Sequence, residues 1–360
     1  MGGTVKVSLQ RSAAIAFVAQ LLFVPYAQSA TLRNHDHPIL QVSLSRASMN
    51  PSSGETLVLH VSLRSAARCG IQVLDRDGFL IRTFPPIDGI AGDNAVVWDG
   101  RDDAGEIVAD EAYSFRVVAD GGNDEYFPAA RNAAMVAVDP LSYSRATATL
   151  TYTLKKPSRV HVQAGTVHGT EGPVLKTIVD RQPRDAGKIA EHWSGFDESG
   201  SLYVPDLTGF VVAIAATPLP ENSVITYGNR KRAFLDYAAH RRGQSLFPHR
   251  APAAHHAGLD VFNDLAPALT LVTNGNRLQL HTSGPTASAF VRHPGEIYIF
   301  VDSNLVMRRD ARKSAEPIEI PIHDDADHVV AVNWRSDYGP VAVGVTKLRR
   351  HAETQSGSRR

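Results

Sequence analysis

The chain has 360 residues, of which 43% are hydrophobic and 21% are charged, and its formal net charge at neutral pH is zero. This length and composition suit two or three folded domains and exclude an intrinsically disordered chain. The single cysteine, Cys69, excludes an intrachain disulfide, and we expect it to be a buried, unreactive thiol near the start of a strand.

Residues 1–30 have the pattern of a secretory signal peptide. Lys6 and Arg11 precede the apolar run AAIAFVAQLLFV, which is followed by a proline and the small-residue stretch AQSA. The run is too short for a transmembrane helix, which needs about 20 apolar residues. We therefore expect export to the periplasm, the cell surface or the medium, with cleavage after Ser29 or Ala30. A retained N-terminal anchor is the alternative, and no later segment has a long apolar run.

An internal repeat follows the leader. The stretch AGDNAVVWDGRDDAGEIVADEAYSFRVVA returns 95 residues later as AGKIAEHWSGFDESGSLYVPDLTGFVVAIAA. Upstream, LHVSLRSAARCGIQV and LTYTLKKPSRVHVQA match at an offset of 91, so the second copy has four extra residues near VHGTEGP, in a position typical of a surface loop. The matched positions are Gly92 and Gly187, Trp98 and Trp193, Gly100 and Gly195, Asp102 and Asp197, Gly105 and Gly200, Phe115 and Phe210, and Val117 and Val212.

Each copy alternates apolar and polar residues in short runs bounded by Gly, Pro, Asn and Asp, which predicts strands. Seven strands in about 80 residues are typical of an antiparallel β-sandwich. In the first copy we expect strands near 39–44, 56–63, 71–74, 80–84, 95–98, 106–108 and 112–118.

The first copy resembles the Ig-like domain named after the flagellar hook-capping protein FlgD. The resemblance rests on SMNPSSGETLVLHVSL, IQVLDRDGFLIRTF and the Trp-Asp-Gly turn, with Trp98, Asp99, Gly100, Asp103, Gly105 and Tyr113 in place. It extends over 39–120 and, in diverged form, over 132–217, where Ser194 replaces Asp99 and Thr208 replaces Tyr113. The resemblance implies Ig-like sandwiches, a module widely reused as a spacer or docking domain in exported bacterial proteins, and it implies almost nothing about activity. The N-terminal region of a hook-capping protein is not recognisable, so a flagellar role is not expected.

Residues 228–264 are basic and His-rich with internal prolines, and they predict a linker with a short helix near 233–240. A third β-rich unit, which we expect to be another sandwich, covers 265–350, and 351–360 is a polar tail. Its strands are expected near 269–272, 277–281, 296–301, 318–322, 329–334 and 341–348. The predicted fold class is therefore all-β, with tandem Ig-like or fibronectin-like sandwiches and a third β-rich domain.

The acidic stretch WDGRDDAGE is a candidate site. Asp99, Asp102, Asp103 and Glu106 offer oxygen ligands for calcium, but the second copy keeps only Asp197 and its neighbour Glu198. What both copies keep predicts a structural turn, with Trp in the core, Gly at positive φ and Asp bonded to backbone N–H groups. This motif consists of Trp98, Gly100, Asp102, Gly105, Trp193, Gly195, Asp197 and Gly200.

Two further clusters are weaker candidates. HDDADH, with His323, Asp325 and His328, has zinc or copper ligands without a recognised spacing, and a polar hairpin loop is the alternative. NHDHP, which contains His35 and His37, is interpreted as part of a tail. We expect no cofactor and keep calcium or zinc as alternatives.

Charge is distributed unevenly along the chain. Between 75 and 125 there are thirteen acidic residues against four Arg and no Lys, whereas 230–250 has six Arg and Lys against one Asp. The basic segment is a candidate for anionic polysaccharide or lipid headgroups, and the acidic stretch or solvent are alternative partners. We expect no nucleic-acid binding. The candidate residues are Arg230, Lys231, Arg232, Arg241, Arg242 and Arg250.

No nucleophile elbow, phosphate-binding glycine loop or paired-cysteine metal motif occurs in the sequence. We therefore expect an exported, non-catalytic structural, adhesive or scaffolding protein of the bacterial envelope, with envelope or extracellular proteins as partners. One alternative is a binding module for glycan or another anionic polymer, which would use the basic segment and the last unit. A second alternative is a metal-dependent enzyme that uses the last unit.

Overall fold

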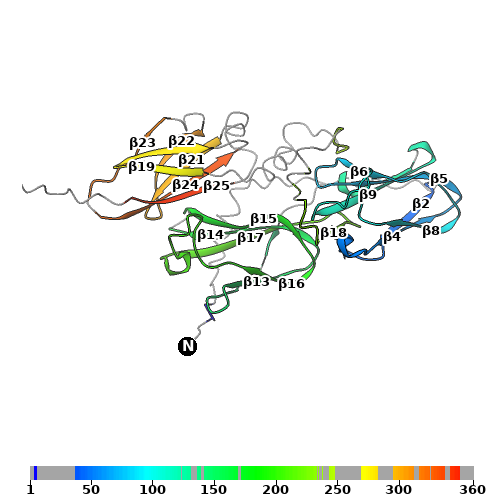
Figure 1. The fold of residues 1–360 in the computed structure, drawn as a ribbon, viewed down its shortest axis with the longest axis horizontal. Coiled ribbons are helices and arrows are strands. Elements are labelled where there is room, and N and C mark those ends of the chain that lie inside the picture. The colour runs from blue at the N-terminus through cyan, green and yellow to red at the C-terminus, as the bar shows by residue number, and fades with distance from the viewer. Residues whose placement is uncertain are drawn as a thin grey trace, which may run out of the picture.

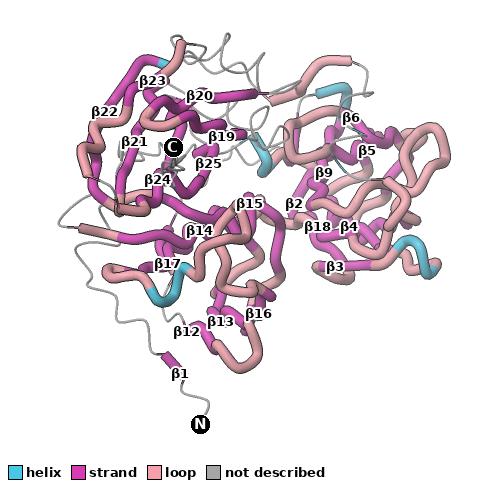
Figure 2. Tube along the Cα trace, turned by 60° about the vertical axis from the view of Figure 1, so that its left-hand side comes forward, coloured by secondary structure: helices cyan, strands magenta, loops and turns pink. Residues whose placement is uncertain are grey.

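The computed structural model consists almost entirely of strands and loops (Figure 1, Figure 2). Within the part of the chain that it describes, no helix is long and apolar enough to cross a bilayer. The described residues are 4–5, 37–122, 124–130, 136–138, 142–168, 172–232, 234, 237, 243–247, 269–282, 295–311, 316–324, 326–336 and 341–348.

The first sandwich pairs a three-stranded sheet with a larger one. In the first sheet the order is β2 (Ile39–Leu44), β4 (Leu57–Leu63) and β8 (Gly92–Trp98). The second sheet contains β3 (Ser48–Met49), β18 (Val224–Thr226), β9 (Ala112–Ala119), β5 (Ala67–Leu74) and β6 (Leu80–Thr83) in that order, with β7 (Ile87–Gly89) on β5 and β10 (Asp124–Tyr126) on β9.

Alternation along the strands makes the core between these sheets. In β4 every second residue, from Leu57 to Leu63, is buried, because successive side chains of a strand point to opposite faces. Trp98 closes this core at the end of β8. Cys69 is also buried here, and desolvation, followed by the charges of Asp120 and Asp124, raises the pKa of its thiol, which disfavours the reactive thiolate.

The second sandwich repeats this strand order. Its smaller sheet is β12 (Ser142–Ser144), β13 (Thr149–Leu154) and β16 (Gly187–His192), with β1 (Thr4–Val5) on β12. Its larger sheet is β11 (Val136–Ala137), β17 (Phe210–Pro218), β14 (Ser158–Thr166) and β15 (Val174–Arg184). Hence β12-β13-β16 corresponds to β2-β4-β8, and β17-β14-β15 corresponds to β9-β5-β6.

The third unit is also built from two sheets. One is β19 (Leu269–Asn274), β20 (Arg277–Thr282) and β23 (Ile318–Glu319). The other is β22 (Asn304–Asp310), β21 (Gly295–Val301), β24 (His328–Ser336) and β25 (Val341–Leu348). The prediction of an all-β chain of Ig-like sandwiches with a β-rich third unit is thus confirmed.

The second and third sandwiches pack face to face. In β21, Ile297 and Ile299 enter the core of the third unit, whereas Phe300 packs into the core cluster of the second. Ala331 of β24 and Val343 of β25 do the same. Figure 1 accordingly shows β24 and β25 lying along β14 and β15. The sheets β11-β17-β14-β15 and β22-β21-β24-β25 therefore share an apolar interface.

Three sequence predictions differ from the structure. The strand expected at 106–108 is one isolated bridge, Arg101 to Ile107, because this stretch belongs to the tight turn after Trp98. Strand β22 was not predicted, and neither were the short strands β3, β7 and β10. The segment expected to be a linker begins on the first sandwich, where Phe234 and Tyr237 are buried in the core. These two are also the described residues of the expected helix, and both are helical.

Candidate functional site

The loop after Trp98 is held together by the side chains of Trp98 and Asp102. The Trp98 indole Nε1 donates to the carbonyl of Arg101 at 2.9 Å. Asp102 Oδ1 accepts the backbone N–H groups of Ala104 at 3.0 Å and Glu106 at 2.9 Å. Asp102 is 7% exposed, and its Oδ1 is occupied by the turn itself.

The second copy repeats the tryptophan bond and the aspartate bond to the N–H four positions on, but its other aspartate bond goes to Leu202 and not to Ser199, the equivalent of Ala104. Trp193 Nε1 donates to the carbonyl of Phe196 at 2.9 Å. Asp197 Oδ1 accepts the N–H groups of Ser201 at 2.8 Å and Leu202 at 2.9 Å. The two loops share Trp, Gly and Asp because these residues build the turn, and the remaining carboxylates of the first copy are not needed for it.

Two of the shared glycines have a steric reason as well as a conformational one. Gly100 has a φ of 72°, and a Cβ there would lie 2.3 Å from Cγ of Pro51. Gly195 has a φ of 90°, and its Cβ would lie 2.3 Å from Cε2 of Tyr203. Such a φ strongly favours glycine, and the contact excludes a larger side chain.

The two copies place a tyrosine against the turn tryptophan from different strands. In the first, the ring of Tyr113 on β9 lies 5.6 Å from that of Trp98, and its hydroxyl donates to the carbonyl of Ala109. In the second copy the strand register places Phe210 of β17 at the corresponding position, with its ring 6.2 Å from that of Trp193, so the expected match of Thr208 to Tyr113 is wrong. There Tyr143 on β12 lies 5.0 Å from Trp193 and donates to the Trp193 carbonyl. Burial raises the pKa of both phenols.

The calcium candidates do not converge on an empty centre. Asp99 Oδ1 accepts the N–H of Arg101 at 3.1 Å, and Asp103 Oδ1 accepts the N–H of Thr83 at 3.0 Å. Asp102 Oδ2 lies 3.2 Å from Nη1 of Arg232. No group of three or more His, Cys, Asp or Glu residues with metal-binding geometry occurs among the described residues.

The basic candidates are not gathered into one patch in the described structure. Arg232 pairs with Asp102 and stacks 4.6 Å above the ring of Tyr237. Arg230 and Lys231 are exposed. Arg232 therefore packs on the first sandwich. Its partner Asp102 belongs to the acidic stretch 75–125. The candidates Arg241, Arg242 and Arg250 lie outside the described residues.

His328 of the metal candidate has a different role in the structure. Its Nδ1 lies 2.6 Å from Asp302 Oδ2, and its Nε2 lies 2.6 Å from Asp324 Oδ1. Hydrogen bonds to Asp302 and Asp324 raise the pKa of the imidazole, which favours its cationic form. A cationic imidazole has no lone pair for a metal. His323 is exposed, whereas Asp325 lies outside the described residues.

Sequence reasoning missed Asp302 as the partner of His328. Asp302 and Ser303 form the tight turn between β21 and β22 and have φ values of 47° and 70°. Asp302 Oδ1 also accepts the N–H of Val329 at 2.9 Å. The sequence signal was weak, because Asp-Ser is not one of the strong hairpin dipeptides such as Asn-Gly.

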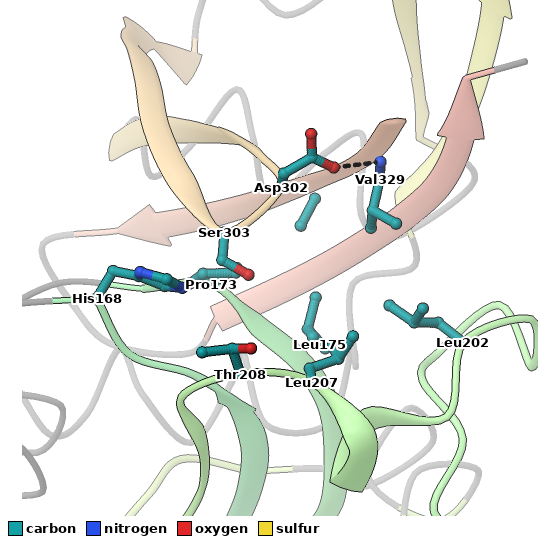
Figure 3. Close-up of a pocket in the computed structure, with 10 residues that line it drawn as sticks. His168, Pro173, Leu175, Leu202, Leu207, Thr208, Asp302, Ser303 and Val329 are labelled. Atoms are coloured by element: carbon teal, nitrogen blue, oxygen red, sulfur yellow. Dashed lines mark hydrogen bonds between the residues drawn. The ribbon is translucent and has the colours of Figure 1, made fainter. Parts of the chain in front are cut away.

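A cavity of about 370 Å³ lies where this turn meets the second sandwich (Figure 3). Its polar edge includes Ser303, whose hydroxyl accepts the Thr166 hydroxyl at 2.8 Å. The hydrogen bond of this pair joins two hydroxyl groups and involves no imidazole. The pair therefore does not have the Ser-His arrangement of an activated nucleophile. The lining residues are His168, Pro173, Leu175, Leu202, Leu207, Thr208, Asp302, Ser303, Val329 and Ala331.

Buried polar side chains join the sandwiches to one another. Glu111 is 2% exposed and receives Arg76 Nη1 at 3.0 Å and Arg159 Nη1, from the second sandwich, at 2.6 Å. Asn333, fully buried on β24, exchanges two hydrogen bonds with the backbone of Val174 on β15. Buried polar groups of this kind fix one relative placement of the domains, because any other would leave them unpaired.

Comparisons with known proteins agree with the first sandwich. Residues 48–123 match the family model described as the FlgD Ig-like domain, in agreement with the resemblance found in the sequence of the first copy. No curated protein matches the chain.

Several solved structures match the chain at low sequence identity and low TM-score. A tetra-tandem repeat from the extending region of a large adhesion protein is 14% identical, covering 85% of this chain and 72% of that one, with a TM-score of 0.17. The central fibronectin-III array of RIM-binding protein is 11% identical, covering 89% and 100%, with a TM-score of 0.20. A structure concerning host cell surface retention of a 1.5-MDa bacterial ice-binding adhesin is 9% identical, covering 87% and 97%, with a TM-score of 0.17.

Proposed function

We propose that this protein is an exported, non-catalytic scaffold of the bacterial envelope that presents its sandwiches in one fixed arrangement for docking. The observation that carries the proposal is the burial of polar side chains between the sandwiches. Glu111 joins the first sandwich to the second, and Asn333 joins the third to the second. Domains that only needed to fold independently would not require such contacts, which hold them in one arrangement.

The interface between the second and third sandwiches supports the same role. Four buried apolar side chains of the third unit pack into the core cluster of the second sandwich and not into that of their own unit: Phe300, Ala331, Val343 and Val345. Large apolar interfaces between domains oppose the relative motion that is the default for tandem domains. A rigid arrangement of this kind suits a component that holds its docking surfaces at fixed positions relative to one another.

The polar groups of the candidate sites support a non-catalytic role. Asp102 and Asp197 bind the backbone of their own turns, and both ring nitrogens of His328 face carboxylates. Groups used in this way are not available as a general base or as metal ligands. The proposal that the chain is exported rests on the leader pattern in 1–30.

Two measurements test the proposal. A fusion of residues 1–36 to alkaline phosphatase, which becomes active only where its disulfides form, is expected to be active in a bacterial host, while the same enzyme without the leader is inactive. Small-angle scattering of the purified protein is expected to fit one rigid body. An inactive fusion would contradict export, and scattering that requires independently moving domains would contradict the fixed scaffold.

A further inference from the structure

The cavity between the second and third sandwiches is built from side chains of both. Leu175 of the second sandwich and Ala331 of the third are buried and form its floor. His168, Thr208 and Asp302 also line the cavity but are exposed, so it opens to solvent between them. Its volume of about 370 Å³ is typical of small-molecule sites, which often form at domain interfaces. The cavity therefore has the size and the location of a ligand site.

The walls between floor and mouth are apolar and only partly covered by protein. Leu202 and Leu207 of the second sandwich and Val329 of β24 line the cavity, and all three are half-buried. Removing apolar surface of this kind from water is the main driving force for binding an apolar molecule. An occupant with an apolar body would be stabilised by these walls.

One side of the cavity carries hydrogen-bonding groups. Figure 3 shows His168, Thr208 and Ser303 on this side and Val329 on the other. Ser303 accepts the proton of the buried Thr166 hydroxyl at 2.8 Å, so its own O–H can donate to an occupant. Ser303 has a φ of 70°, at which the backbone alone favours glycine. The serine thus adds a hydrogen-bond donor to the cavity at a position that does not otherwise suit it.

The carboxylate of Asp302 determines which charge an occupant can carry. Its oxygens are bonded to the N–H of Val329 and to the imidazole of His328, whose other nitrogen faces Asp324. One imidazolium between two carboxylates leaves a net negative charge at this edge. No Lys or Arg is among the described residues that line the cavity. An anionic head group would therefore be repelled, whereas a neutral hydroxyl or carbonyl would not.

We propose that this cavity binds a small, uncharged, amphipathic molecule. Its apolar body lies against Leu202, Leu207 and Val329, and a hydroxyl or carbonyl group accepts a hydrogen bond from Ser303. Because both sandwiches supply walls, the bound molecule contacts both and stabilises their packed arrangement by mass action. The inference concerns a ligand site and does not rest on the proposed scaffold role.

Displacement of an uncharged fluorescent probe tests the proposal. N-phenyl-1-naphthylamine fluoresces weakly in water and strongly in an apolar site. With the purified protein we expect a saturable rise in fluorescence, which 1-octanol reverses by competition. Octanoate has the same chain length but is anionic, and it should compete at least about fivefold less well, because Asp302 repels it. Absence of a saturable rise, or octanoate that competes as well as 1-octanol, would overturn the proposal.

A filled cavity distinguishes this site from other apolar surfaces of the protein. Val329→Phe adds a ring inside the cavity and is expected to weaken probe binding at least about tenfold, because ring and probe cannot occupy the same space. Val272→Phe makes the same change on β19 at a position that is 46% exposed, and it should leave the probe affinity unchanged. Equal probe affinities of the two variants would place the probe elsewhere and contradict the proposal.

A second variant tests the hydrogen bond without crowding the cavity. Ser303→Gly removes the hydroxyl and suits the positive φ, so the turn is expected to be kept. It should weaken competition by 1-octanol about fivefold, which corresponds to the loss of one hydrogen bond, and leave the affinity for the probe nearly unchanged. Ala148→Gly, at another positive φ outside the cavity, is the matched control. Competition by 1-octanol that is equal in these two variants would count against the proposal.

Discussion

Asn333 and Val174 are bonded across two sandwiches as though they were paired residues of one sheet. The side-chain Nδ2 of Asn333 donates to the carbonyl of Val174 at 2.8 Å, and its Oδ1 accepts the N–H of Val174 at the same distance. Both bonds are buried. A side-chain amide on β24 therefore satisfies the main chain of β15, and neither sandwich can move away without exposing or orphaning these groups.

Replacing Asn333 is expected to destabilise the protein because the backbone groups of Val174 lose their hydrogen-bond partners. Asn333→Ala leaves the buried N–H and carbonyl of Val174 without these partners, which costs about 2 kcal/mol of unfolding free energy. Denaturant titration measures the loss. Gln279→Ala, at an exposed position of β20, is the control and is expected to change stability by less than about 0.5 kcal/mol. Equal effects of the two substitutions would mean that the interface is not sealed.

The turn motif predicts different outcomes for its tryptophan and its outer carboxylate. Trp98 is 1% exposed, so Trp98→Ala is expected to cost about 3–5 kcal/mol by thermal or denaturant unfolding. Asp103 has a side chain that is 55% exposed and accepts one backbone N–H, so Asp103→Asn is expected to cost less than about 1 kcal/mol. Added calcium is expected to leave the melting temperature of both the unmodified chain and Asp103→Asn unchanged. A calcium-dependent rise that Asp103→Asn abolishes would show that the turn is a metal site.

His328 is expected to make stability depend on pH. Its pKa is raised in the folded chain by Asp302 and Asp324, so the folded state binds its proton more tightly than the unfolded state does. The resulting stabilisation is complete below the unfolded pKa of about 6.5 and is lost as pH rises through the folded pKa. Unfolding free energies measured from pH 5 to 9 should fall across that window.

The pH effect can be assigned to His328 by substitution. In His328→Gln the part of the pH dependence above about 6.5 is expected to shrink, since that group no longer titrates. His281→Gln, at an exposed position of β20, removes an imidazole elsewhere and should leave the profile unchanged. A profile that His281→Gln alters as much as His328→Gln would mean that the carboxylate pair does not hold the proton.

The strands of the two repeats could be predicted because their alternation and their turns are local properties. Trp98 and Trp193 lie at equal spacing from Gly100 and Gly195; in both copies the indole donates to the carbonyl three residues on, and the glycine has a positive φ. Strand β22 was missed because its sequence, NLVMRRD, ends in charged residues and its turn has no glycine. It is an edge strand, where charged side chains can remain in contact with solvent.

The packing between sandwiches is a long-range property, although the sequence contains a trace of it. Strands β21, β24 and β25 have apolar residues at consecutive positions, as in IYIFV, VVAV and VAVGV. A strand with two apolar faces is expected to be covered on both. Such a run does not indicate which element covers the second face. The sequence also did not predict that β18, Phe234 and Tyr237 pack on the first sandwich. Both features depend on contacts between residues far apart in the chain.

Glu111 provides a test of how strongly the first two sandwiches are coupled. Its side chain is 3% exposed and faces Arg76 and Arg159, so Glu111→Ala leaves two guanidinium groups without their carboxylate. Breaking a buried pair from one side costs about 3–5 kcal/mol. A double-mutant cycle with Arg159→Ala isolates the contact between sandwiches, and we expect a coupling energy of about 1–3 kcal/mol.

An exposed pair is the control for this cycle. Arg277 and Glu319 lie 3.4 Å apart, but their side chains are 68% and 75% exposed, so solvent screens the interaction. Their cycle is expected to give less than about 0.5 kcal/mol. Raising the salt concentration should reduce this small coupling further and leave that of Glu111 and Arg159 nearly unchanged, because a buried pair is screened much less. A coupling at Glu111 that is as small and as salt-sensitive as the control would mean that the first sandwich moves independently of the second.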